Sequence, residues 1–139
     1  MPLNIVVDSG FWFALFDERD SYHEEALELV TYIEDFNVLI PWPTLYETLN
    51  TRLVKRPERR EAFKRFFEGS NVTKIDDTPY RDDSIIVVLN PLMGQEYSSV
   101  DYIIRQILED TDIKTDALIT FNARDFEDIC YQKGIELLP

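Results

Sequence analysis

The sequence predicts an α/β protein, a three-layer α/β/α sandwich around a five-stranded parallel sheet. Two observations support this prediction: short apolar, β-branched runs recur along the chain, and segments with helical spacing fill the gaps between them. Strands that alternate with helices pair in parallel and are covered by helices on both faces. With 139 residues, the chain is expected to form one domain, residues 1–139. The five expected strands are Ile5–Val7, Val38–Ile40, Val72–Ile75, Ala117–Thr120 and Ile135–Leu137.

The helices of the first half are predicted from caps and apolar spacing. Ser21 reads as the N-cap of a helix, because Glu24 stands three residues later and completes a capping box. Proline residues then introduce a helix that runs through Leu53, and Pro57 separates it from the next one, which Gly69 ends. The apolar faces of these three helices are Ala26, Leu27, Val30 and Ile33; Leu45, Leu49 and Leu53; and Phe63, Phe66 and Phe67.

Two further helices are predicted in the second half. One covers residues 82–89 and ends before Pro91, and the other begins at Ser98 or Ser99. The segment from Pro91 to Tyr97 is the longest expected loop. The second helix carries one buried stripe, formed by Val100, Ile103, Ile104, Ile107 and Leu108.

The composition excludes several kinds of site. Cys130 is the only cysteine and His23 the only histidine, so an internal disulfide, a cysteine-based zinc site and a histidine metal cluster are excluded. The single cysteine suits a reducing cytoplasm, and we expect a cytoplasmic protein without a signal peptide. No apolar run has the roughly 18 residues of a membrane span, so no membrane association is expected.

The charge is unevenly distributed. The net charge of −13 argues against a nucleic-acid partner, because phosphates favour Lys and Arg. However, half of the 14 basic residues lie in one short segment, which is either an ordinary solvated helix surface or a contact for RNA phosphates. They are Arg52, Lys55, Arg56, Arg59, Arg60, Lys64 and Arg65, of which the first five are the expected RNA-binding residues.

Four acidic residues share one kind of position. Asp8 and Asp125 follow expected strands, and Glu47 and Asp101 lie in the first turns of helices. These positions meet at one edge of a doubly wound sheet. Two carboxylates about 4 Å apart repel by roughly 4 kcal/mol at an effective dielectric constant of about 20, and a divalent cation removes this cost. Oxygen ligands alone favour Mg²⁺ or Mn²⁺, which activate water for attack on a phosphodiester.

A simpler explanation of these acids stays open. Glu47 and Asp101 each stand three residues after a Thr or Ser, which is the spacing of a capping box. With 27 acidic residues in the chain, chance groupings are also common.

Four segments together resemble a known family. "IVVDSGFWFALFDERDSYHEEA" is similar to the opening of PIN-domain ribonucleases, especially toxins of the VapC type, and "PWPTLYETLN", "SSVDYIIRQIL" and "DALITFNARDF" resemble the three following motifs in the same order. The resemblance spans residues 4–126. It implies Mg²⁺- or Mn²⁺-dependent hydrolysis of RNA by an endoribonuclease, with Asp8, Glu47 and Asp101 at the catalytic and metal-binding site. It also implies a cognate antitoxin and a homodimer as partners.

The fourth motif departs from the family. Relatives often carry Asp two residues after the Thr that ends the fourth strand, where this chain has Asn122. We predict that Asp125 supplies the fourth carboxylate, and that Asn122 hydrogen-bonds at the rim of the site or to a metal-bound water, with Thr120 and Ser9 also supporting the site or the substrate. Alternatively, Asp125 only complements a helix dipole.

Three other classes of protein share part of this pattern. A phosphoacceptor receiver domain needs paired acids after its first strand and a Lys after a late strand, and Asp8 stands alone with no such Lys. A catalytically silent PIN fold that binds RNA or protein is a stronger alternative, because of Asn122. An RNA-processing PIN nuclease without an antitoxin also fits the same residues.

Overall fold

The protein is built around a five-stranded, all-parallel sheet. The computed structural model describes residues 2–92 and 96–139. The strand order is β3-β2-β1-β4-β5, and Ile5 of β1 lies beside Val38 of β2 and Ala117 of β4. The predicted strands and fold class are thus confirmed. The observed bounds are β1 Asn4–Val7, β2 Asn37–Pro41, β3 Val72–Ile75, β4 Ala117–Ile119 and β5 Glu136–Leu138.

Helices fill the connections between the strands. Between β1 and β3 lie α1 (Ser9–Phe16), α2 (His23–Glu34), α3 (Trp42–Leu49), α4 (Arg52–Lys55) and α5 (Pro57–Phe67). After β3 come η1 (Thr78–Tyr80), α6 (Arg81–Leu89) and α7 (Ser99–Glu109), and after β4 come η2 (Ala123–Asp125) and α8 (Glu127–Lys133). The predicted loop at residues 91–97 includes positions 93–95, which lie outside the described residues.

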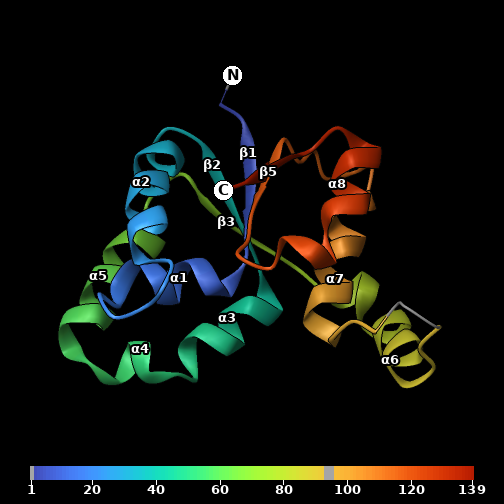
Figure 1. The fold of residues 1–139 in the computed structure, drawn as a ribbon, viewed down its shortest axis with the longest axis horizontal. Coiled ribbons are helices and arrows are strands. Elements are labelled where there is room, and N and C mark those ends of the chain that lie inside the picture. The colour runs from blue at the N-terminus through green and yellow to red at the C-terminus, as the bar shows by residue number, and fades with distance from the viewer. Residues whose placement is uncertain (1, 93–95) are drawn as a thin grey trace.

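The sheet is covered on both faces, as Figure 1 shows with α1, α2 and α5 on one side and α7 and α8 on the other. Successive strand residues point to opposite faces, so Ile5 and Val7 pack in one core while Val6 packs in the other. All three are at most 1% exposed. Burial on both faces explains why the strands read as continuous apolar runs.

The strand order creates a switch point next to β1. The chain first moves from β1 to β2 and β3, and then crosses to β4 on the other side of β1. Connections that leave in opposite directions open a crevice at the carboxyl ends of the two central strands. Asp8 follows β1 and Thr120 follows β4, so this crevice is the natural place for a site.

Two predicted helix boundaries are wrong. The second helix begins at His23 and not after Ser21, and no side chain caps it. Asp20 organises this turn instead: its Oδ1 accepts from the Tyr22 N–H at 2.9 Å, and its carbonyl accepts from the His23 N–H. The imidazole Nδ1 of His23 donates to the Ala14 carbonyl at 2.7 Å, which joins α2 to α1.

The helix predicted through Leu53 is divided in two. It ends at Leu49, and a new turn begins at Arg52, because Thr51 adopts an extended backbone and accepts from the Leu53 N–H. Leu49, predicted to be buried, is 46% exposed. Similarly, Leu27 of α2 was predicted to be buried and is exposed. Leu29 is buried instead.

Candidate active site

Asp8 lies where β1 ends, and its side chain caps the helix that follows. Its Oδ1 accepts from the Ser9 N–H at 2.7 Å, and its Oδ2 accepts from the Thr120 hydroxyl at 3.0 Å. Thr120 is buried and follows β4, the strand beside β1. These two contacts fix the carboxylate at the crevice between the central strands.

Glu47 is joined to Asp8 through the neighbouring serine. The Ser9 hydroxyl donates to Glu47 Oε1 at 2.9 Å, although the two residues are 38 positions apart. The capping-box explanation for Glu47 is wrong, because α3 begins at Trp42 and Thr44 donates its hydroxyl to the Pro41 carbonyl. Glu47 is therefore free of a capping role and faces the same crevice as Asp8.

Asp101 enters the crevice from α7. The helix is capped by Ser98, whose hydroxyl oxygen accepts from the Asp101 N–H at 3.1 Å. The predicted start of this helix is therefore confirmed. The side chain of Asp101 is half-buried, and the negative charges of Asp8 and Asp125 act on it.

The fourth motif brings Asn122 and Asp125 together. The Asn122 side-chain amide donates to Asp125 Oδ2, and the Asn122 N–H donates to the Thr120 hydroxyl at 3.0 Å. Asp125 ends the short 3₁₀ turn η2, and its carboxylate contacts Asn122 at the start of that turn. Thr120 thus connects Asp8 to the segment that carries the fourth acid.

The electrostatics of the four acids are those of a like-charge cluster. Burial raises the pKa of Asp8, with the charge of Asp125 adding to it, and burial with the charge of Asp8 raises the pKa of Glu47. The pKa of Asp101 is raised to about 7, by burial first and then by the charges of Asp8 and Asp125. No residue in the described part of the chain forms an ion pair with any of the four.

Comparisons with known proteins identify the architecture. The sequence matches no protein-family profile and no curated protein. Among solved structures, it is similar to the crystal structure of VapC20 from Mycobacterium tuberculosis, described as a sarcin-ricin loop cleaving toxin, with a TM-score of 0.66. The match covers 89% of this chain and 94% of that chain, at 21% identity. The chain has a PIN-like fold.

The four carboxylates of this PIN-like fold suit a hard divalent cation. As they stand, however, the described residues contain no group of three or more His, Cys, Asp or Glu side chains arranged to hold a metal ion. Burial raises the pKa values of Asp8 and Asp101, and repulsion between carboxylates without a counter-ion adds to this. The donor set is oxygen only, and Asp8, Glu47, Asp101 and Asp125 are the residues that would hold Mg²⁺ or Mn²⁺.

The acid cluster predicts how stability depends on pH in the absence of divalent metal. A carboxyl whose pKa is raised by folding, as for Asp101 from 3.8 to about 7, binds its proton more tightly in the native state, so its contribution to stability is lost as the pH rises through this range. We expect the melting temperature of the metal-free protein to decrease between about pH 5 and pH 8. Asp101→Asn removes most of this decrease.

A matched control separates the cluster from other acids. Asp76 is exposed, and hydrogen bonds from Thr78 lower its pKa, so it titrates below this pH range and Asp76→Asn should leave the decrease unchanged. Thermal melts at constant ionic strength measure both variants. A melting temperature of Asp101→Asn that falls as steeply as that of the wild type would contradict the prediction.

Sequence reasoning missed Arg105, which supports the fourth motif. Arg105 lies one turn after Asp101 on α7, and its guanidinium donates to the Asp125 carbonyl at 2.8 Å and to both carboxylate oxygens of Asp128. It also lies over the Tyr97 ring, 4.6 Å from the ring centroid. Its i, i+4 spacing from Asp101 was the available signal. Arg105 therefore fixes η2 against α7 through the backbone.

The predicted RNA-binding residues lie on α4 and α5 and in the turn between them. Arg59 is paired with Asp17 at 3.2 Å, and the guanidinium of Arg60 donates to the Val54 carbonyl. Arg52, Lys55 and Arg56 are exposed. No helix among the described residues is long and apolar enough to cross a membrane.

Proposed function

We propose that the protein is a divalent-metal-dependent endoribonuclease that hydrolyses phosphodiester bonds of RNA, as the VapC-like toxin of a toxin–antitoxin pair. The supporting observation is that four carboxylates from separate elements lie close enough at one edge of the sheet for their charges to act on one another. They are Asp8, Glu47, Asp101 and Asp125. The fold supports the same proposal, because the structurally similar VapC20 is described as a sarcin-ricin loop cleaving toxin. Incubation of the purified protein with end-labelled RNA and Mg²⁺ tests it, with internal cleavage as the expected result.

In this proposal, the chain's own residues hold the site in a fixed shape. Asp8 is oriented by the Ser9 N–H and the Thr120 hydroxyl, and Glu47 by the Ser9 hydroxyl. Glu47 is exposed as a residue although its carboxylate is partly desolvated, so water still reaches it, and in this proposal it orients the attacking water. A bound Mg²⁺ or Mn²⁺ would activate water and neutralise charge on the phosphodiester.

Variants of Asn122 and Asp125 test which of these two residues fills the fourth place in the acidic site. Asp125 brings a charge, whereas Asn122 only donates to Asp125 and orients it. We expect Asp125→Asn to reduce cleavage and to raise the Mg²⁺ concentration needed for half-maximal rate, and Asn122→Ala to have a smaller effect of the same kind. Rates measured against Mg²⁺ concentration decide this. Loss of activity in Asn122→Ala with a neutral Asp125→Asn would reverse the assignment.

We also propose that the basic segment binds RNA phosphates. Each contact with a single strand adds roughly 0.7 to the slope of log affinity against log salt concentration. Changing Arg56, Arg59 and Arg60 together to Gln should therefore weaken binding and flatten this slope. Because Arg59 is already paired with Asp17, we expect it to contribute less than Arg56. An unchanged slope would show that the segment is an ordinary solvated surface that does not contact RNA phosphates.

Protein partners are also part of this proposal. An antitoxin would neutralise the nuclease, and a second copy of the chain would form a homodimer. An apolar surface on and after α6 supports a protein contact, since Ile86, Leu89 and Leu92 are 60%, 73% and 70% exposed. A monomeric mass by light scattering at micromolar concentration would contradict the homodimer.

A further inference from the structure

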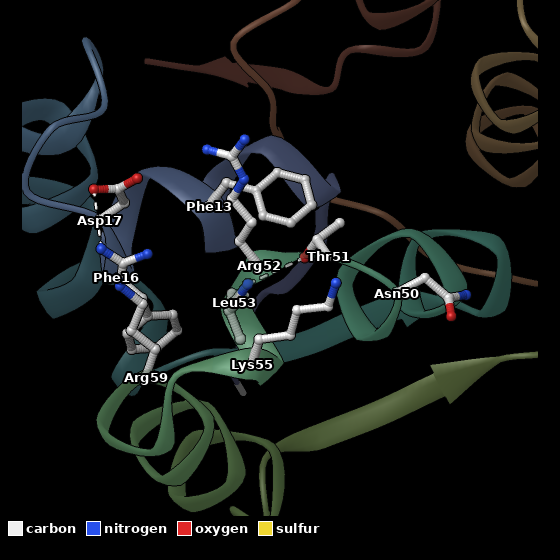
Figure 2. Close-up of a pocket in the computed structure, with 9 residues that line it drawn as sticks. All are labelled: Phe13, Phe16, Asp17, Asn50, Thr51, Arg52, Leu53, Lys55 and Arg59. Atoms are coloured by element: carbon white, nitrogen blue, oxygen red, sulfur yellow. Dashed lines mark hydrogen bonds and ion pairs between the residues drawn. The ribbon is translucent and has the colours of Figure 1, made fainter.

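A pocket of about 440 Å³ opens between α1 and the turn that joins α3 to α4. Its lining includes the carboxylate of Asp17, which is paired with Arg59 at 3.2 Å. Figure 2 shows the residues around it, with side chains from α1 on one side and from α4 on the other. Its volume lies in the range of sites that enclose small organic groups. The residues important here are Phe13, Phe16, Thr51, Arg52, Lys55 and Arg59.

The walls of this pocket combine aromatic and cationic chemistry. Phe13 and Phe16 are partly buried, and Phe16 packs edge-on against Phe63, so both rings are held by the core. Arg52 and Lys55 extend from α4 at the mouth. The described residues offer neither of them a carboxylate within ion-pair distance, although the chain has a net charge of −13. The pocket therefore matches an anionic ligand that carries a flat, apolar ring.

Two elements, α1 and α3, lead from the carboxylates of Asp8 and Glu47 to the pocket. Asp8 caps α1, and Phe13 follows five residues later, roughly 7.5 Å along the helix axis. Glu47 lies on the last turn of α3, three residues before Asn50, the first residue of the turn that lines the pocket. A polymeric ligand bound at the carboxylates therefore reaches the pocket within a short step along its chain.

We propose that this pocket accepts a nucleobase of the RNA strand, stacked against Phe13 and Phe16, with the adjoining phosphate on Arg52 and Lys55. The proposal rests on the proposed ribonuclease function. Stacking of bases on aromatic side chains, with Arg and Lys along the backbone, is the usual way to bind a single strand. The base in the pocket then sets the register of the strand and so selects which phosphate lies at the carboxylates.

The experiment couples one ring of the protein to one base of the RNA. In the Asp8→Asn background, which retains the RNA uncut, short labelled single-stranded RNAs are titrated by fluorescence anisotropy, intact or with one base at a time replaced by an abasic sugar. We expect removal of one particular base to weaken binding about tenfold. Adding Phe13→Leu should lower the affinity for intact RNA and abolish the effect of that base, whereas Phe13→Tyr, which keeps the ring, should preserve both.

A second pair of variants tests the cations. Arg52→Gln with Lys55→Gln should flatten the salt dependence of binding. Lys133→Gln, which changes an exposed lysine of α8 outside the pocket and outside the basic segment, should leave it unchanged. Thermal melts establish that each variant folds. The same abasic penalty in Phe13→Leu as in its parent would overturn the proposal, and so would an unaltered salt slope in the Arg52 and Lys55 variant.

The failure of this proposal can be told apart from failure of the proposed function. Cleavage by the wild type without coupling between Phe13 and any base rejects the pocket and retains the nuclease. Coupling without cleavage retains the pocket and rejects the nuclease. No binding of any RNA rejects both, and leaves an acidic protein as the partner of these cations.

Discussion

Replacing Asp8 or Asp101 by Asn is expected to lower RNA cleavage by a hundredfold or more while the protein stays folded. The change is nearly isosteric and removes a charge that a cation at this site requires. A hundredfold loss corresponds to about 3 kcal/mol of transition-state stabilisation. Single-turnover cleavage of labelled RNA, with thermal melts of the same samples, measures the effect.

The stability part of this prediction separates function from structure. Since burial and neighbouring charges raise the pKa of both carboxyls, removing either charge relieves repulsion and should preserve or increase the melting temperature. Asp76→Asn, at an exposed position directly after β3, serves as the control for the substitution itself. Loss of the thermal transition in both site variants would show that these residues serve the fold and not the chemistry.

Chelation of divalent ions is expected to abolish RNA cleavage, and Mg²⁺ or Mn²⁺ should restore it. The reason is that the four carboxylates repel one another and have no cationic side chain paired with them in the described residues. A cation that binds only the folded state also stabilises it, by about 2.7 kcal/mol at 100 times its dissociation constant. Chelator titration of the cleavage rate, alongside thermal melts, measures both effects.

The double variant Asp8→Asn with Asp101→Asn is the matched control for chelation. Its melting temperature should not respond to Mg²⁺, because two of the four carboxylates proposed to hold the ion are gone. Undiminished cleavage in excess chelator would reject a metal-dependent mechanism. A folded protein that binds RNA and never cleaves it would support a silent PIN-like module, the alternative that Asn122 raised.

The sheet was predictable because its strands are short, β-branched and buried on both faces, as in Ile5–Val7. The start of α2 was not predictable, because two capping solutions competed locally. Ser21 with Glu24 has the capping-box spacing, but Asp20 forms the turn instead, and His23 contacts the Ala14 carbonyl nine positions away, a contact that local spacing does not indicate. Periodicity alone also cannot show that Thr51 restarts the helix after Leu49.

Strand ends and helix starts predicted where the four acids lie along the chain. They did not predict the hydrogen bonds that join the acids to other residues. Thr120 joins Asp8 to the Asn122 segment through hydrogen bonds between distant residues. Arg105 contacts Asp125 from 20 positions away. The aromatic pocket was also missed, because its rings come from α1 and its cations from α4, where they had been assigned only to phosphate contacts.

Direct binding of Mn²⁺ tests the central claim most directly. Electron paramagnetic resonance measures free Mn²⁺ as it is titrated into the purified protein, with Asp76→Asn as a control beside the double variant Asp8→Asn with Asp101→Asn. The four-carboxylate site predicts that the wild type and Asp76→Asn each bind at least one ion, and that the double variant binds none at the same concentrations. Equal Mn²⁺ binding by the wild type and the double variant, or no binding by the wild type, would contradict it.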